Sequence, residues 1–231
     1  KNVSVGIFGS LQSYPPISDK NILFYLPDTF APDASAYPEE LSIFQDFNLS
    51  LVGNNKAKAG GITLKDIKKL LRCYLKSVLK KRTLVKIIFH LAKEIYNPKF
   101  KIRRSLLQPI LSFEPFLEQL KYNKPDFVTF FTNHVAGVMH RYWFDFFPTD
   151  FKTPPRKIDS FRKNTLINAL DIADYQISKL LEFSDANSYQ LWVASSMGQS
   201  SIERGKYIKE LYIQDFYRLI DKLDLKKENY E

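Results

Sequence analysis

The sequence predicts an α/β fold in which a mostly parallel sheet is covered by helices and interrupted by an inserted, basic, all-helical cap. Two patterns predict this class: short, largely apolar segments that resemble buried strands, and amphipathic helical segments between them. The length of 231 residues suits one large α/β domain or a core with one inserted subdomain. Apolar residues make up 45% of the chain, so it can bury a substantial core.

Four segments are predicted as strands because they are short, apolar and rich in β-branched or aromatic residues. They cover residues 3–9, 21–26, 126–131 and 189–194. Continuous apolar character, rather than alternation, is typical of parallel strands that are covered on both faces. Each segment is followed by small or polar residues. Because ligand sites of open α/β sheets form outside the carboxyl ends of the strands, we expect the functional residues at these junctions.

Helices are predicted between the strands. Residues 63 to about 82 carry apolar residues at helical spacing, and Thr63 with Asp66 matches a variant of the capping box. A second helix is expected over 83–96. Residues 105–122 are expected to form shorter turns because Pro109 and Pro115 interrupt them. Helical periodicity returns over 160–183 and 203–223.

The charge is concentrated in one block. Between Lys56 and Arg104 there are 16 Lys and Arg residues against two acids, in a chain with a net charge of +9. We therefore expect residues 1–55 to form the first part of the α/β core, 56–123 a basic helical insertion or cap, and 124–231 the second part. Such a block is typical of a surface that faces an anion, although a solvated helical face would look the same.

Composition excludes several classes of protein. A single cysteine, Cys73, rules out an internal disulfide framework and a cysteine-clustered zinc site, and it is compatible with a reducing compartment. No run of 18 apolar residues predicts a transmembrane helix, and the N-terminus lacks the pattern of a signal peptide. The compartment is otherwise not specified. Since the chain does not begin with Met, we treat it as a portion of a longer protein.

The densest group of chemically capable residues follows the third predicted strand. Asn133, His134, His140 and Arg141 fall within nine residues, in what we expect to be a loop. His134 and His140 are candidate ligands for a divalent metal such as zinc or manganese, or candidates for a general acid and base. Arg141 is a candidate clamp for a phosphoryl or sulfuryl oxygen. The alternative is that both histidines bond to the backbone of a tight loop.

Two further junctions supply candidate substrate-binding residues. Ser195, Ser196 and Gln199 follow the fourth predicted strand, where hydroxyl and N–H groups can hold an anion. Asp28 follows the second strand and is a candidate ligand or substrate contact. Serine, glycine and aspartate are also ordinary turn residues, so this pattern alone is weak.

Taken together, two stretches resemble the alkaline phosphatase superfamily of phosphatases, phosphodiesterases and sulfatases. They are Thr-Asn-His-Val-Ala…Met-His-Arg-Tyr-Trp (132–143) and Val-Ala-Ser-Ser-Met-Gly-Gln (193–199), and the pair resembles a little-characterised, alkaline-phosphatase-like bacterial branch. The resemblance covers roughly residues 1–50 and 125–200. It implies a hydrolase or transferase that acts on a phosphate or sulfate ester of an anionic substrate, such as a glycan or nucleotide, with a divalent metal.

The departures from the family pattern concern the metal site. The Asp-His metal pair of the family falls on Ser196 and Met197, which are poor zinc ligands. The Asp of the earlier loop falls on Asn133 or Ala136, and no histidine follows His140. The usual two-metal site therefore cannot be assembled from these residues, and the resemblance places the nucleophile upstream of Lys1.

Three functions remain open at this point. The first is the ester hydrolase or transferase, and the second is a non-catalytic relative that binds an anionic glycan, nucleotide or partner. The third is contact with a membrane surface or nucleic acid through the basic block. Nucleic acid is less favoured, because aromatic residues are not interleaved on the basic face and no nucleic-acid motif is present.

Overall fold

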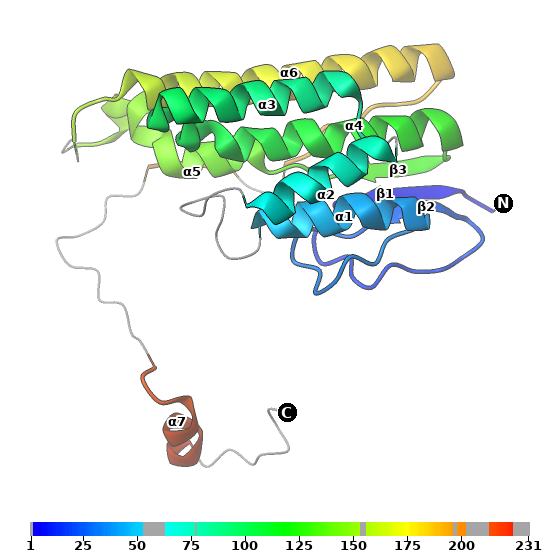
Figure 1. Cartoon of the computed structure of the whole chain (residues 1–231), viewed down its shortest axis with the longest axis horizontal. Helices are drawn as coiled ribbons and strands as arrows, with labels where there is room; N and C mark the ends of the chain where they lie inside the picture. Colours follow the sequence, from blue (N-terminus) through cyan, green and yellow to red (C-terminus); the bar gives the residue numbers. More distant parts are fainter. Residues whose placement is uncertain are drawn as a thin grey trace. The chain divides into compact units, whose positions relative to one another are not determined.

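The structure is a computed structural model that describes residues 2–52, 63–76, 78–152, 156–195, 198–201 and 213–223 (Figure 1). The chain divides into two compact units, residues 1–199 and residues 200–231. The first unit contains the sheet and most of the helices. In the second, the described residues include one short helix, α7 (Phe216–Lys222). Residues 203–212 of the predicted helix over 203–223 lie outside the described residues, and α7 is the helical part of the rest.

The first unit contains a three-stranded parallel sheet with the order β2-β1-β3. Its strands are β1 (Val5–Phe8), β2 (Ile22–Leu26) and β3 (Phe127–Phe130). Both neighbours of β1 run parallel to it. The predicted α/β class and three of the four predicted strands are thus confirmed.

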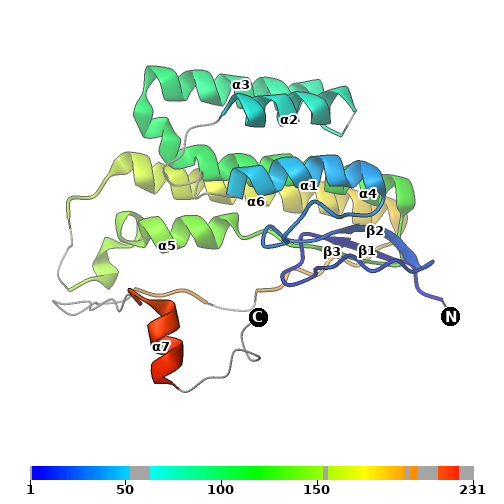
Figure 2. The ribbon, with the colours of Figure 1, turned by 60° about the horizontal axis from the view of Figure 1, so that its bottom comes forward.

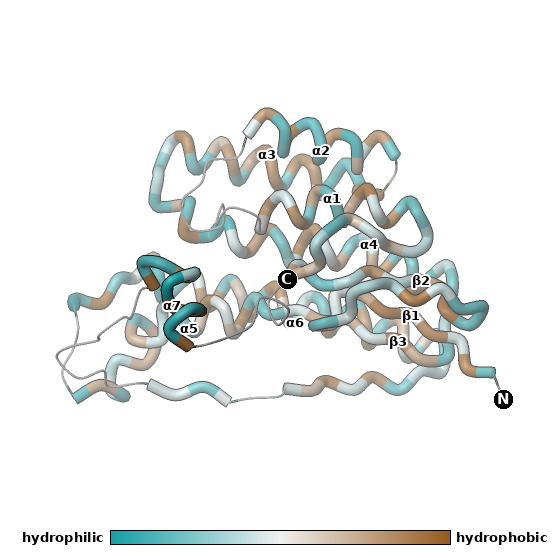
Figure 3. Tube along the Cα trace, turned by 90° about the horizontal axis from the view of Figure 1, so that it is seen from below, coloured by the Kyte–Doolittle hydropathy of each residue, from teal (hydrophilic) through white to brown (hydrophobic). Residues whose placement is uncertain are grey.

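The fourth predicted strand is wrong. Residues 189–194 have no strand structure, and in Figure 3 the segment after α6 runs on the β3 side of the sheet without joining it. Tyr189 is anchored, because its hydroxyl donates to the carbonyl of Pro125 at 2.6 Å. Trp192 and Val193 are 84% and 73% exposed. An apolar run predicts a buried strand only if a neighbouring element covers it, and these side chains are not covered by the described residues.

The helices of the first unit differ from the predicted ones in four places. α1 (Glu39–Val52) and α5 (His134–Phe146) were not predicted, and α5 replaces the expected loop after β3. The predicted helix over 63–82 ends earlier, giving α2 (Leu64–Leu75) and α3 (Lys81–Tyr96). α4 (Leu107–Asn123) is one helix rather than broken turns, although Pro115 lies inside it. The remaining elements are η2 (Pro98–Leu106), η3 (Pro148–Asp150) and α6 (Ser160–Asn187), the last close to its prediction.

Apart from α5, which lies beside the sheet, the α-helices of the first unit form two layers over one face of it (Figure 2). α1, α4 and α6 lie next to the sheet, and α2 and α3 form the outermost layer. The core between the sheet and the inner helices is aromatic, with Phe8, Phe24, Phe44 and Phe116 almost fully buried. α4 contributes to this core, and the helices between residues 64 and 123 belong to the same compact unit as the sheet.

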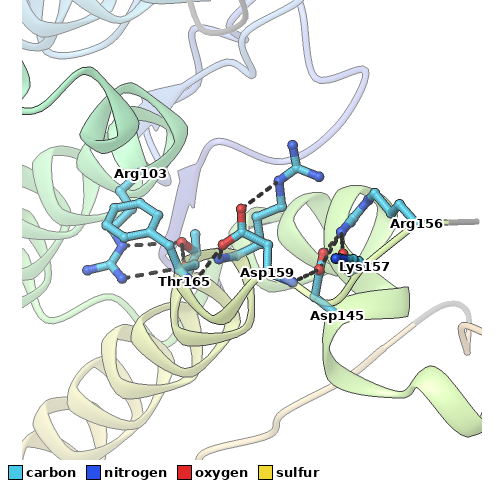
Figure 4. Close-up of polar contacts among 8 residues, drawn as sticks. Arg103, Asp145, Arg156, Lys157, Asp159 and Thr165 are labelled. Carbon is cyan, nitrogen blue, oxygen red and sulfur yellow. Dashed lines mark hydrogen bonds and ion pairs between the residues drawn. The ribbon is translucent and has the colours of Figure 1, made fainter.

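A polar cluster fixes the connection between α5 and α6 (Figure 4). Asp145 near the end of α5 is 1% exposed, and its carboxylate accepts from Arg156 and from the backbone N–H of Asp159. Asp159 in turn caps α6, because its side chain accepts from the N–H groups of Phe161 and Arg162. α5 is therefore held against α6 at its carboxyl end as well as through the apolar contacts of Val138.

Within the described residues, none of the helices combines the length and the apolar character needed to cross a lipid bilayer.

Candidate functional site

A cavity of about 290 Å³ lies at the carboxyl ends of all three strands. Phe8 and Gly9 end β1, Leu26 and Asp28 end β2, and Phe131 follows β3. In a parallel sheet these ends meet at one edge, which is the usual place for a ligand. We call this cavity the strand-end pocket.

The turn after β1 opens the pocket on one side. Gly9 has a φ of +71°, a conformation that side-chain-bearing residues rarely adopt, and its N–H donates to the carbonyl of Leu26 at 2.8 Å. The chain then turns back so that the backbone N–H of Gln12 donates to the carboxylate of Asp28. Asp28 is 4% exposed and also accepts from the N–H of Phe30 at 2.9 Å. Asp28 thus ties the loops after β1 and β2 together.

Buried amides form the opposite wall. The Gln45 amide on α1 donates to the Asp28 carbonyl at 2.9 Å, and the Asn48 amide donates to Gln45 Oε1 at 3.2 Å. Gln108 on α4 donates to Asn48 Oδ1 at 3.4 Å. Asn48 and Gln108 both line the pocket, as does Ser105, whose buried hydroxyl has no hydrogen-bond partner. A buried hydroxyl without a partner is costly, so a polar ligand or water in the pocket would stabilise it.

The amino end of α5 forms the third wall. Asn133 is the N-cap residue, yet its side chain makes no capping hydrogen bond. The first-turn N–H groups of α5 therefore lack the side-chain acceptor that a capped helix has. Asn133, His134, Gly137 and Arg141 line the pocket from this helix. Since Tyr142 has non-helical backbone angles, the regular part of α5 ends directly after Arg141.

Arg141 supplies a cation to the pocket wall. Its side chain is exposed and makes no hydrogen bond or ion pair with the described residues. An unpaired guanidinium presents up to five N–H donors in a planar fork that matches a phosphate, sulfate or carboxylate group.

His134 is buried and holds α5 against α6. Its Nε2 lies 3.0 Å from the carbonyl oxygen of Ala169, and its Nδ1 lies 2.7 Å from the hydroxyl of Thr132. Because a carbonyl only accepts, we assign the proton of the neutral ring to Nε2 and the acceptor role to Nδ1. Burial lowers the pKa of His134, and the Ala169 carbonyl opposes this in part. Both ring nitrogens are therefore used within the fold, which does not favour His134 as a metal ligand, and the lowered pKa makes the ring a weak base.

His140 lies apart from the pocket. It comes six residues after His134, which on a helix is a rotation of roughly 240°. His140 is exposed and does not line the pocket, and its Nδ1 accepts from the Gln199 amide at 2.9 Å. Of the other predicted residues, Ser195 is exposed and also does not line the pocket, and Ser196 lies outside the described residues.

The described residues do not fit the divalent metal site expected from the resemblance. They contain no group of three His, Cys, Asp or Glu side chains that could hold a zinc or manganese ion. His134 and His140, the two predicted ligands, face different partners on different sides of α5.

The sequence thus placed four of its candidates in one pocket: Asp28, Asn133, His134 and Arg141. It missed Asn48, Ser105 and Gln108. A helix over 39–52 places the Asn48 amide among apolar residues on the core face, so the sequence marks this residue only where that helix is predicted.

No family model matches the chain, and neither the curated proteins nor the solved structures include a match to it.

Proposed function

We propose that the strand-end pocket binds a small organic phosphate or sulfate ester, with sugar-like hydroxyl groups on its neutral part. The observation that carries this proposal is that an uncapped helix end and an unpaired arginine line the same pocket. Asn133 marks that helix end and Arg141 is the arginine.

The anionic group is recognised by the α5 wall. The N-terminus of a helix carries a partial positive charge and free N–H groups, so it stabilises phosphate or sulfate oxygens. Arg141 adds a full positive charge and paired donors. The Asn133 side chain makes no hydrogen bond with the described residues and adds a further donor.

The neutral part of the ligand is recognised by the remaining walls. Asp28 offers carboxylate oxygens that accept from hydroxyl groups, and Asn48, Gln108 and Ser105 offer amide and hydroxyl groups. Phe30, which is 78% exposed, and Phe131 provide apolar surface beside them. Such a mixture suits a polyhydroxylated ring better than a purely apolar molecule. A cavity of about 290 Å³ is near the lower limit for small-molecule sites, which favours a monosaccharide-sized ligand.

Binding is better supported than hydrolysis. Ester cleavage needs a nucleophile with a base beside it. Among the described pocket residues, the Thr132 hydroxyl donates to His134 Nδ1, but burial lowers the pKa of this ring and makes it a weak base. The Ser105 hydroxyl has no partner to take its proton. The hydrolase or transferase activity implied by the resemblance stays a prediction, and the experiment below includes it.

The test is calorimetric titration of the full chain with inorganic phosphate, inorganic sulfate and a hexose phosphate. We expect the hexose phosphate to bind more tightly than either inorganic ion, because only it reaches the amide wall. Arg141→Gln should weaken binding of all three about tenfold or more, since it removes charged hydrogen bonds. Lys121→Gln, which removes an exposed cation from α4, is the control and should bind like the wild type.

The proposal is contradicted if the wild type binds none of the three probes, or if Arg141→Gln binds them as tightly as the wild type does. Loss of binding in His140→Gln would also contradict it, because it would place the site on the other side of α5. Release of inorganic phosphate or sulfate from the ester probe, absent in Arg141→Gln, would extend the proposal from binding to hydrolysis.

A further inference from the structure

The outer layer of the first unit exposes many apolar side chains. On α2 the spacing of Leu64, Ile67, Leu71 and Leu75 places them along one side of the helix, and all four are exposed, Leu64 and Leu75 by 78% and 77%. The inward side of the same helix is formed by the buried Leu70 and Cys73. The apolar periodicity of α2 therefore has two parts, one that packs on the core and one that does not.

α3 repeats this arrangement. Ile87 is buried against the core, whereas the opposite side of the helix is exposed and apolar. Phe89, Ile95 and Tyr96 are 63%, 87% and 94% exposed, and Val85 and Ile88 are more than half exposed. α2 and α3 lie together in the layer farthest from the sheet (Figure 2). We call the exposed apolar residues of these two helices and the cations between them the α2–α3 outer face.

Unpaired cations accompany these apolar residues. Their side chains are exposed and make no hydrogen bond or ion pair with the described residues. On α2 they are Lys65, Lys68 and Arg72, followed by Lys76 at its C-cap, and on α3 they are Lys81, Arg82 and Lys86.

The two acids of these helices do not neutralise the outer face. Asp66 is 2% exposed and completes the capping box of α2 with Thr63. Glu94 is 5% exposed and pairs with Arg104 and with the His90 ring. The outer face is therefore apolar and cationic, without an exposed acid on either helix.

We propose that the α2–α3 outer face docks onto the surface of an anionic lipid bilayer. Interfacial helices combine an apolar side that enters the headgroup region with Lys and Arg that bind anionic lipids. Long Lys and Arg side chains can follow the apolar residues inward while their charges stay at the headgroups. α2 and α3, with 12 and 16 residues, are long enough to lie in the interface. Apart from Phe89 and Tyr96, the exposed apolar side chains of this face are aliphatic and cannot stack on bases, so nucleic acid fits it less well.

The test is co-sedimentation of the full chain with vesicles of phosphatidylcholine alone or mixed with phosphatidylglycerol. We expect binding to the anionic vesicles, weakened by added salt, and little binding to the neutral ones. The charge variant Lys68→Glu/Arg72→Glu/Lys86→Glu should bind the anionic vesicles about tenfold or more weakly. The apolar variant Leu64→Ser/Leu75→Ser/Ile95→Ser should also bind more weakly, because it removes side chains that enter the interface.

Matched changes elsewhere serve as controls. Lys121→Glu and Tyr122→Ser alter an exposed cation and an 88% exposed aromatic residue on α4, and vesicle binding should be unchanged. Arg141→Gln should also leave vesicle binding intact, which separates this surface from the strand-end pocket. Circular dichroism should show that each variant keeps its helices, since all the altered side chains are exposed.

The proposal is overturned if the wild type does not sediment with anionic vesicles, or if the charge variant binds as well as the wild type. Binding of an acidic amphipathic peptide without any vesicle binding would also overturn it and would assign the surface to a protein partner.

Discussion

The Asp145 carboxylate is buried and depends on a small number of donors. Burial by itself raises the pKa of Asp145, but the hydrogen bonds from Arg156 and from the Asp159 N–H outweigh it and keep the pKa below the usual value. The aspartate is therefore ionised in the fold. A buried charge of this kind is stable only while its partners remain.

Removing Arg156 tests whether the buried Asp145 charge depends on this partner. Arg156→Ala leaves Asp145 with the Asp159 N–H but without its cation, and we expect a loss of about 2 kcal/mol in the free energy of unfolding. The loss is smaller than for a fully buried pair because the Arg156 side chain is 33% exposed. Lys179→Ala, which removes an exposed pair with Glu182 on α6, is the control and should change stability by less than about 0.5 kcal/mol. Urea denaturation measures both, and equal effects would contradict the role given to Asp145.

His134 should make the fold sensitive to acid. Its pKa is lowered in the folded state, mainly by burial, so the unfolded chain binds more protons once the pH falls below about 6.5. The stability that comes from the neutral ring is present above that pH and is lost as the pH falls. Burial also lowers the pKa of His90, which acts in the same direction.

His134→Gln tests this sign. We expect the fall in melting temperature between about pH 7.5 and about pH 5.5 to be smaller in the variant than in the wild type. His140→Gln, which removes an exposed imidazole, should keep the acid sensitivity of the wild type. An unchanged pH dependence in His134→Gln would show that the buried ring is not responsible.

At the scale of elements, local pattern and tertiary packing disagree in two places. The residues of α5 directly follow a strand, a position that predicts a loop with functional residues. In the structure Val138 packs with Leu166 and Ala169 of α6, and this packing supports the helix. Residues 189–194 show the reverse, because their apolar pattern suits a strand but the described residues provide no strand partner. Both the helix over 134–146 and the absence of a strand over 189–194 depend on tertiary packing, which the local sequence does not specify.

Gly6 couples β1 to β2. A Cβ at this position would overlap the ring of Phe24, which is fully buried. We expect Gly6→Ala to cost about 1–3 kcal/mol in the free energy of unfolding. In Gly6→Ala/Phe24→Leu the smaller side chain makes room, so the loss should be less than the sum of the two single losses.

The same substitution on α5 is the control. A Cβ on Gly137 meets nothing within 4 Å, so Gly137→Ala should be neutral or stabilising by up to about 1 kcal/mol. Destabilisation of similar size at both glycines, measured by urea denaturation, would contradict the packing described here.

At the scale of the whole molecule, the pocket lies where parallel sheets usually bind ligands, at the carboxyl ends of the strands. Which residues line it depends on the secondary structure that follows each strand. Asp28, Asn133 and Arg141 follow strands and line the pocket. His140 was grouped with them because it is close in sequence, but on a helix it faces another side. The charge block was also predicted as one surface, yet Arg103 packs on the Phe161 ring and Arg104 pairs with Glu94. On α2, Lys69 pairs with Asp46, and the unpaired cations of α2 and α3 belong to the α2–α3 outer face.

The central claim is that the strand-end pocket holds an anionic ester against the amino end of α5 and Arg141. The most direct measurement is a two-dimensional NMR titration of the ¹⁵N-labelled chain with a hexose phosphate. We expect the largest shifts at the backbone amides of residues 134–136 and at the side-chain N–H of Arg141, with smaller shifts at the Asn48 and Gln108 amides. Shifts confined to His140 and Gln199, or to α2 and α3, or no shifts at all, would contradict it.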